Sequence, residues 1–227
     1  MPKKSNYWLK NAAITIFQNS SSLVLGFLNF YMLIRLLTPN DYGSWIIFIS
    51  IITVVELSKN GLTQEATIKY LAGANFSDRR KIVTAAFIIN VCVATIVAVL
   101  FLIFSPLAGK LWSSPALPLM LNLYTTTFII SGILSELNCI EQANLQFKGT
   151  SFSAIAKQTV PFFYILYHYI NEQHVDLVHF TLVNILGVVA AACISLLFSY
   201  KYVRFTKVID RVWIKKILNF GKYSFAI

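Results

Sequence analysis

Apolar residues in this chain fall into long blocks separated by short polar stretches, and the length of these blocks restricts the possible folds. Six blocks are near the ~20 residues that a helix needs to cross the hydrocarbon core of a bilayer. They cover residues 12–37, 42–60, 82–106, 117–138, 152–170 and 178–200, and residues 217–227 begin a seventh. Only 12% of the residues are charged, about half the usual share, which is too few to cover a water-facing surface. We therefore expect an all-α integral membrane protein with a six-transmembrane-helix bundle.

The distribution of Lys and Arg predicts the orientation, because these residues accumulate in cytoplasmic loops. Apart from Lys157 inside the fifth block, the end opposite the N-terminus would carry only Arg35 and Lys110. The N-terminal end would carry Lys3, Lys4, Lys10, Lys59, Lys69, Arg79, Arg80, Lys81, Lys148, Lys201, Arg204, Lys207, Arg211, Lys215, Lys216 and Lys222. Both termini are therefore expected in the cytoplasm. The net charge of +10 suits anionic membrane lipids, and no nucleic-acid partner is expected.

Residues 203–216 have the pattern of an amphipathic helix. One side would carry Phe205, Val208, Ile209, Val212 and Trp213, and the other Arg204, Lys207, Arg211 and Lys215. Such a helix lies in the membrane interface. We expect a cytoplasmic anchor here, in preference to a regulatory site.

The segment RLLTPNDYG at residues 35–43, followed by GLTQ at residues 61–64, resembles the polysaccharide-transport family of the multidrug/oligosaccharidyl-lipid/polysaccharide exporter superfamily, which includes O-antigen flippases. Transporters of this superfamily have two similar lobes, and WIKK at residues 213–216 echoes WLKN at residues 8–11. The resemblance implies an N-terminal lobe over residues 1–202, a linker helix over 203–216 and the truncated start of a second lobe at 217–227. The chain would then be one half of a transporter.

The function that this resemblance implies is transport without catalysis. A full transporter of this kind moves an undecaprenyl-pyrophosphate-linked oligosaccharide to the periplasmic leaflet of the bacterial inner membrane by rocking two lobes around a cavity. The expected partners are the lipid-linked oligosaccharide, membrane lipids, and a second lobe or polysaccharide-assembly proteins. No cofactor is expected, and a gradient of H⁺ or Na⁺ would supply the energy.

Three of the apolar blocks contain polar residues at helical spacing, which predicts polar faces that meet in a shared lumen. The stripes consist of Gln18, Ser22, Gly26 and Asn29; of Ser50, Thr53, Glu56, Asn60 and Gln64; and of Asn122, Thr125, Thr126, Gly132 and Glu136. Hydrogen bonding that only joins the helices is the alternative, and we favour it for Ser and Thr.

The carboxylates are candidates for an ion path. Glu56 lies in an otherwise apolar run, where it would carry a proton or a cation during transport, or else form a structural ion pair with Lys59. These two interpretations remain equal at this point. Glu136 and Glu141 lie near the cytoplasmic end of the fourth block, and solvated charges are at least as good an explanation for them.

Arg35 and Lys157 are the cationic candidates, because a lipid pyrophosphate needs Arg or Lys in its path. Lys157 precedes Pro161, which would kink the helix. For Lys157 we slightly favour the alternative that its amine reaches the cytoplasmic headgroups. Arg35 has the alternative of pairing with Asp41 across the turn.

Other chemistries find little support in the sequence. The cysteines and histidines lack the spacing of a metal site, and no phosphate-binding glycine loop is present. A membrane enzyme such as a polysaccharide polymerase would need a larger extramembrane loop. A non-transporting assembly protein of the same pathway and a drug exporter of the same superfamily remain as alternatives.

Overall fold

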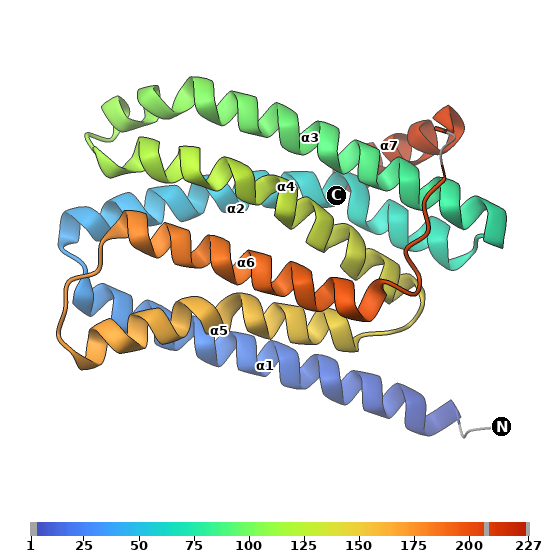
Figure 1. Ribbon diagram of the computed structural model, residues 1–227, viewed down its shortest axis with the longest axis horizontal. Helices are drawn as coiled ribbons and strands as arrows, with labels where there is room; N and C mark the ends of the chain where they lie inside the picture. The colour runs from blue at the N-terminus through green and yellow to red at the C-terminus, as the bar shows by residue number, and fades with distance from the viewer. Residues whose placement is uncertain (1–3, 207–208, 226–227) are drawn as a thin grey trace.

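The computed structural model describes residues 4–206 and 209–225, which form seven α-helices and, in these ranges, no strand (Figure 1). The helices are α1 (Lys4–Leu36), α2 (Pro39–Ala72), α3 (Phe76–Leu111), α4 (Ala116–Ala143), α5 (Lys148–Ile170), α6 (Leu177–Ser199) and α7 (Arg211–Phe225). The all-α class is therefore confirmed. Each of the first six helices contains one predicted apolar block, although two blocks run one residue past the end of their helix. Most of these helices are longer than the block they contain, because the polar residues beside the block are also helical.

The turn between α1 and α2 follows directly from its sequence. Thr38 has an extended backbone, and its side-chain oxygen accepts a hydrogen bond of 3.2 Å from the backbone N–H of Asp41. Pro39 occupies the first helical position, where the missing N–H of proline is no loss. The Thr-Pro-Asn-Asp segment thus caps α2 and reverses the chain within two residues.

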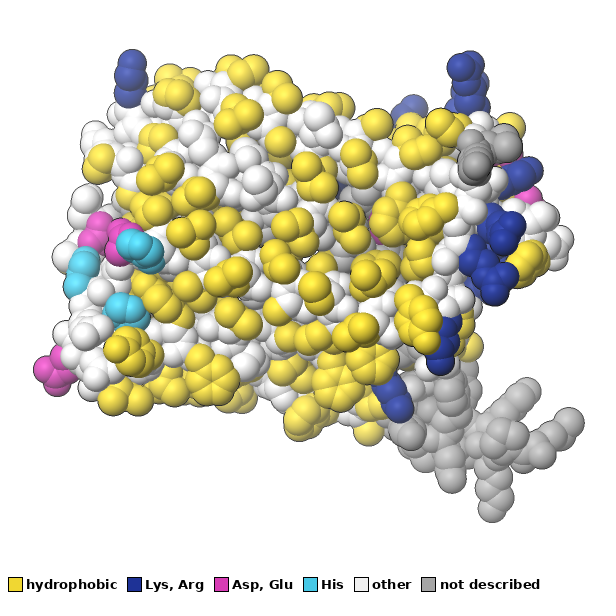
Figure 2. All heavy atoms as spheres, viewed as in Figure 1, with side chains coloured by type: hydrophobic (Ala, Val, Ile, Leu, Met, Phe, Trp, Pro, Cys, Tyr) yellow, Lys and Arg dark blue, Asp and Glu magenta, His cyan; other side chains and the backbone are white. Residues whose placement is uncertain are grey.

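Four helices, α2, α3, α4 and α6, are long and apolar enough to cross a membrane. Large apolar side chains cover their outer faces; Ile103 of α3, for example, is 62% exposed. Figure 2 shows this apolar band between one end rich in Lys and Arg and another where His and acidic side chains gather. This distribution is that of a membrane protein. The chain enters α1 and α3 at the basic end (Figure 1), as the predicted charge distribution requires.

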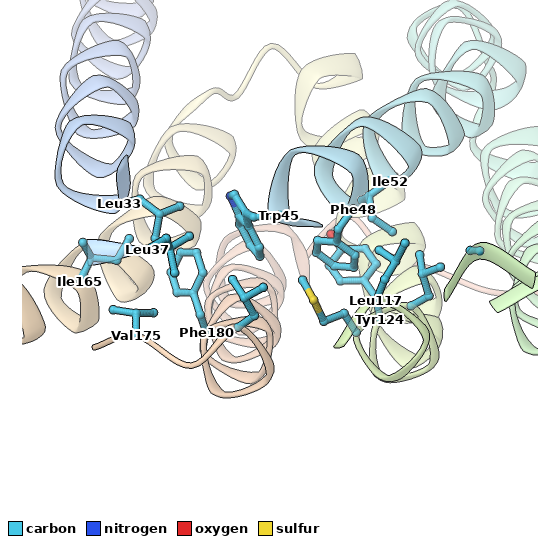
Figure 3. Packing of buried hydrophobic residues seen from close by; sticks show 14 of the residues in the cluster. Leu33, Leu37, Trp45, Phe48, Ile52, Leu117, Tyr124, Ile165, Val175 and Phe180 are labelled. Carbon is cyan, nitrogen blue, oxygen red and sulfur yellow. The ribbon is translucent and has the colours of Figure 1, made fainter. Parts of the chain in front are cut away.

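Two large apolar clusters hold the bundle together, one toward each end, and a small third cluster around Leu134 and Val188 joins α4 to α6. The larger cluster joins the turns between α1 and α2 and between α5 and α6 to the first half of α4, and is rich in aromatic rings (Figure 3). Trp45 packs against Phe180 with ring centroids 4.6 Å apart. The smaller of the two large clusters joins α2, α3 and α4 to Ile217 of α7 at the basic end. Between these clusters, α2 and α4 turn polar side chains such as Asn60 and Ser135 toward the bundle interior.

The helix expected over residues 203–216 is wrong in its first half. Residues 203–206 and 209–210 are not helical, and α7 begins only at Arg211; residues 207–208 lie outside the described ranges. The segment instead packs along α3, where the backbone N–H of Thr206 donates to Thr84 Oγ1 at 3.0 Å. The ring of Phe205 lies 5.2 Å from that of Phe87. These tertiary contacts override the helical pattern.

Asp210 explains why α7 begins where it does. Its carboxylate accepts a hydrogen bond of 2.9 Å from the backbone N–H of Val212 and pairs with Lys81 of α3 at 3.3 Å. The Val212 hydrogen bond, aided by Lys81, lowers the pKa of Asp210 below its ordinary value. α7 is therefore both capped and attached to the bundle by one side chain.

Gly187 offers a test of the packing between α5 and α6. A Cβ at this position would lie 2.7 Å from the backbone oxygen of Lys157 and 3.3 Å from Pro161 Cδ, whereas a Cβ at Gly26 would meet nothing within 4 Å. Both glycines are inside helices, where alanine is intrinsically favoured. We expect Gly187→Ala to lower the stability by about 1 kcal/mol through overpacking, and Gly26→Ala to leave it equal or higher. Thermal unfolding in detergent measures the stability of both variants. Equal stability of the two variants would contradict the close contact between α5 and α6.

Candidate functional site

A polar cavity of about 260 Å³ lies inside the bundle, between α2 and α4 on one side and α1 and α5 on the other. α1 contributes one of its lining residues, and α2, α4 and α5 contribute the rest. They are Gln18, Glu56, Lys59, Asn60, Gln64, Ser131, Leu134, Ser135, Asn138, Gln142, Thr150, Ser153, Ala154 and Lys157. Nearly all of these side chains are polar, in a protein whose outer faces are apolar. α1, α2, α4 and α5 therefore share a polar cavity.

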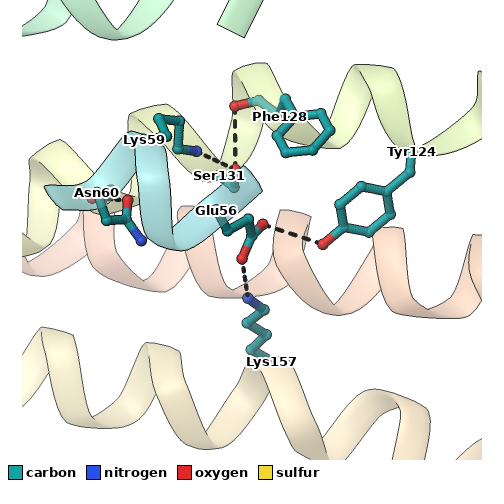
Figure 4. A network of polar contacts seen from close by, with 8 residues as sticks. Glu56, Lys59, Asn60, Tyr124, Phe128, Ser131 and Lys157 are labelled. Carbon is teal, nitrogen blue, oxygen red and sulfur yellow. Dashed lines mark hydrogen bonds and ion pairs between the residues drawn. The ribbon is translucent and has the colours of Figure 1, made fainter. Parts of the chain in front are cut away.

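Glu56 and Lys157 form an ion pair across this cavity (Figure 4). The Lys157 amine lies 3.8 Å from Glu56 Oε2, and Tyr124 donates a hydrogen bond of 3.3 Å to Glu56 Oε1. The ring of Tyr124 belongs to the larger apolar cluster, where it packs edge-on against Phe48. The carboxylate is thus oriented by a group anchored in the core, while Lys157, with 40% of its side chain exposed, remains accessible from the cavity.

Lys59 is inside the protein, and its amine bonds to Ser131 of α4 and not to Glu56 (Figure 4). It is only 2% exposed, and its amine donates to Ser131 Oγ at 2.7 Å. The amine also lies 5.8 Å from the centre of the Phe128 ring. The alternative of a structural Glu56–Lys59 ion pair is therefore wrong. Although the two residues lie one turn apart, α2 directs one side chain toward α5 and the other toward α4.

Glu136 lies behind Lys59 and is completely buried between α2, α3 and α4. Its Oε1 accepts a hydrogen bond from the Asn90 amide, which also donates to Thr63 Oγ1 at 3.3 Å. Three nearby oxygen atoms are buried and have no hydrogen-bond partner among the described residues: Glu136 Oε2, Asn90 Oδ1 and Thr67 Oγ1. A solvated carboxylate, as the sequence suggested, is ruled out by this burial.

Glu141 is also buried, at 1% exposure, and has a structural role. Its Oε2 accepts hydrogen bonds from the backbone N–H and the hydroxyl of Thr150, at 2.6 and 3.1 Å. These donors belong to the first turn of α5, where unpaired N–H groups and the helix dipole favour a negative charge. Glu141 thus caps α5 from the end of α4, and solvation is the wrong explanation here too.

The structure brings four of the seven predicted path residues together. Gln18, Glu56, Asn60 and Lys157 line the cavity, while Glu136 lies in the buried cluster beside it. Gln18 accepts a hydrogen bond of 2.8 Å from Ser151, and Asn60 one of 3.2 Å from Ser135. Asn29 is on α1 outside the cavity.

Arg35 is the other predicted residue that lies outside the cavity, at the opposite end of the bundle. Its guanidinium stacks on the Tyr31 ring at 4.5 Å. The expected pair with Asp41 is wrong: the Asp41 carboxylate accepts a hydrogen bond from Thr38 and lies 3.6 Å from the ring nitrogen Nε2 of His174.

The polar face of α4 differs from the predicted stripe. The cavity is lined by Ser131, Ser135, Asn138 and Gln142, which recur at helical spacing further along than the stripe proposed from Asn122 onward. Asn122 instead accepts a hydrogen bond of 2.7 Å from Ser105 of α3. The same periodicity would have identified the correct stripe if it had been continued to residue 142.

No metal centre accompanies these residues: across residues 4–206 and 209–225, no three His, Cys, Asp or Glu side chains are grouped closely enough to hold an ion. The chemistry available at the site is hydrogen bonding and charge. The polar cavity of this otherwise apolar protein is lined by two amines, one half-buried carboxylate, and several amides and hydroxyls.

In a comparison with protein families, the model of a family described as "polysaccharide biosynthesis protein" matches residues 32–227. No curated protein and no solved structure matches the chain. The matched range contains almost all of the cavity, with only Gln18 of its lining residues outside it.

The Glu56–Lys157 interaction can be measured by a double-mutant cycle. Glu56→Gln and Lys157→Gln each leave one charge without its partner, whereas the double variant removes both. We expect the double variant to lose less stability than the sum of the singles, with a coupling of roughly 0.5 to 1 kcal/mol because Lys157 is partly exposed. A cycle between the exposed Glu65 and Lys157 serves as the control and should be additive. Additivity in both cycles, measured by unfolding in detergent, would contradict the pair.

Proposed function

The chain belongs to the family of polysaccharide biosynthesis proteins, and we propose that within this process it is a flippase for a lipid-linked oligosaccharide. The substrate would be a polysaccharide repeat unit, such as that of O antigen, attached to undecaprenyl pyrophosphate. It would be transferred to the periplasmic leaflet of the bacterial inner membrane. The observation that carries this proposal is the polar, charged cavity inside an apolar helical bundle.

The composition of the cavity suits both parts of the polar headgroup of such a lipid. A glycan is bound by hydrogen-bond donors and acceptors such as Asn60, Asn138 and Gln64. A pyrophosphate is bound by cations, and the Lys157 amine faces the cavity with only a long contact of 3.8 Å to Glu56. Phosphate competes well for such an amine, because charge-assisted hydrogen bonds are roughly twice as strong as neutral ones.

We propose that α1 and α5 also cross the membrane, which gives six transmembrane helices in the N-terminal lobe of an exporter of the polysaccharide-transport type. They contain 33 and 23 residues, and at about 1.5 Å per residue both exceed the ~30 Å hydrocarbon core. Their lower hydropathy has a local cause, because Gln18, Thr150, Ser153 and Lys157 face the cavity. The other side of α1 presents large apolar side chains such as Leu23, which is 75% exposed.

In the proposed orientation, the basic end that contains the start of α3 lies in the cytoplasm, with the N-terminus. A second lobe would face the open side of the cavity, since alternating access requires two bundles that rock against each other. α1 packs along α5, whereas α2 packs against α3, α4 and α7. α1 and α2 therefore pack on different helices, and the cavity lies between the α1–α5 and α2–α4 pairs.

We further propose that Glu136 takes part in coupling transport to H⁺ or Na⁺. An ionisable side chain buried in a membrane bundle is costly and commonly marks an ion path. Glu136 fits this role because its free oxygen lies in a buried cluster with the unpartnered oxygens of Asn90 and Thr67. The neighbouring Lys59 connects this cluster to the cavity through Ser131.

The transport proposal is tested in cells whose surface polysaccharide depends on this protein. Lys157→Ala removes the cation that would hold the pyrophosphate, and Glu56→Gln removes its partner. We expect each to reduce surface polysaccharide at least tenfold at unchanged protein level, while the exposed Glu65→Gln has no effect. Lipid-linked oligosaccharide should accumulate on the cytoplasmic leaflet. Accumulation of unpolymerised units in the periplasm would indicate a polymerase instead, and normal polysaccharide in both variants would exclude Glu56 and Lys157 from the transport path.

The coupling proposal is tested with Glu136→Gln, which keeps the shape of the side chain and removes its charge. In liposomes that contain the complete transporter and a fluorescent lipid-linked oligosaccharide, we expect flipping to lose its response to an imposed H⁺ or Na⁺ gradient. Unfolding temperature should not fall, because Gln can still bond to Asn90. A retained response to both gradients would refute the role of Glu136 and leave the flippase proposal intact.

A further inference from the structure

A second pocket, separate from the polar cavity, lies at the basic end of the bundle. It has a volume of about 170 Å³ and is formed by the start of α3, the end of α4 and the segment that follows α6. We call it the basic pocket. Its lining residues are Leu71, Phe76, Arg79, Arg80, Val83, Ile140, Lys201, Tyr202 and Arg204.

Four cations converge on the basic pocket, and no carboxylate is among its lining residues in the described part of the chain. The guanidinium carbons of Arg80 and Arg204 lie 5.4 and 5.1 Å from the centre of the same ring, that of Phe76. Arg79 donates a hydrogen bond of 2.5 Å to Asn144 Oδ1. The arginines are thus held in place by contacts that leave their charge uncompensated.

The contrast with neighbouring Lys81 shows that this lack of compensation is local. Lys81 is paired with Asp210 at 3.3 Å, whereas within residues 4–206 and 209–225 none of the four cations of the basic pocket forms an ion pair. Like charges held close together repel one another unless an anion lies between them. Planar guanidinium groups match the oxygen atoms of a phosphate in particular.

The position of the basic pocket along α3 indicates that the phosphate belongs to a membrane lipid. α3 has 36 residues and a length of about 54 Å, compared with ~30 Å of hydrocarbon. Its first turns, which contain Phe76, Arg79 and Arg80, therefore extend into the headgroup layer. The pocket also has an apolar side, and Phe76 is 61% exposed at its edge. An acyl chain can pass there into the hydrocarbon.

We propose that the basic pocket binds the phosphate of an anionic phospholipid, with its acyl chains beside Phe76. Arg80 from α3 and Arg204 from the segment after α6 would hold the phosphate between them. The lipid would thereby fasten this segment, and α7 beyond it, to the start of α3. The proposal is independent of what the polar cavity transports.

The test uses the full chain in detergent and native mass spectrometry, with phosphatidylglycerol and phosphatidylcholine of identical acyl chains. The site variant is Arg80→Ala/Arg204→Ala, which spares Arg79 and its bond to Asn144. The control variant is Lys215→Ala/Lys216→Ala on α7, which removes the same charge from exposed positions at the same end. We expect the native chain to prefer phosphatidylglycerol. The site variant should bind it about 30-fold more weakly, at roughly 1 kcal/mol per basic residue.

Three results would overturn the proposal. If phosphatidylglycerol binding weakened equally in the site and control variants, the lipid would be attracted by the overall positive charge of this end and not by a specific site. Unchanged binding in the site variant would place the lipid elsewhere. Saturation by inorganic phosphate alone, at concentrations where phosphatidylglycerol does not bind, would assign the pocket to a soluble anion. The proposal would be supported if the site variant alone lost phosphatidylglycerol binding while its binding of phosphatidylcholine stayed unchanged.

Discussion

A polar or charged group inside an apolar bundle must find its partners within the protein, and this constraint determines the arrangement of α2, α4 and α5. Hydrocarbon offers no hydrogen bonds, so each buried polar side chain that lacks a partner costs free energy. Glu56 is held by Tyr124 and Lys157, Lys59 by Ser131, and Glu141 by the start of α5. These contacts join helices that are distant in sequence, and they leave a polar space where the helices do not meet.

The cavity is placed by the two apolar clusters on either side of it. The aromatic cluster around Trp45 and Phe128 closes the bundle at the end of the short turns, and the cluster around Ile217 closes α2 and α3 at the basic end. Polar residues of α2 and α4 occupy the interval between them. In the proposed flippase, part of the glycan headgroup would bind in this interval, while the lipid chain would remain outside, among the exposed apolar side chains.

The sequence predicts the features that depend on local pattern. The length of the apolar blocks predicts six long helices, and the interval between the blocks 12–37 and 42–60 predicts the first turn. Glu56, Asn60, Gln18 and Lys157 were identified separately because polar residues in apolar runs are conspicuous. These four residues meet in one cavity, but the identity of their partners depends on helix rotation. That is why the sequence leaves a Glu56–Lys59 pair and an ion-path role equally open, whereas α2 turns Lys59 toward Ser131.

Long-range packing explains the other differences. Glu136 and Glu141 resembled solvated charges because their positions near the end of a block say nothing about α3 and α5, which cover them. Residues 203–206 have a helical pattern but bind along α3 instead. In each case the deciding contact comes from a residue far along the chain, and a periodic pattern contains no information about such contacts.

The most direct test of the central claim is protection of the cavity by its substrate. A chain with Cys92, Cys139 and Cys193 replaced by serine or alanine would carry Asn60→Cys as its single thiol, in a complete transporter in membranes. A membrane-impermeant thiol reagent should modify this cysteine, and added lipid-linked oligosaccharide should slow the modification. Equal rates with and without the lipid-linked oligosaccharide, for an accessible thiol, would contradict the assignment of this cavity as the transport path.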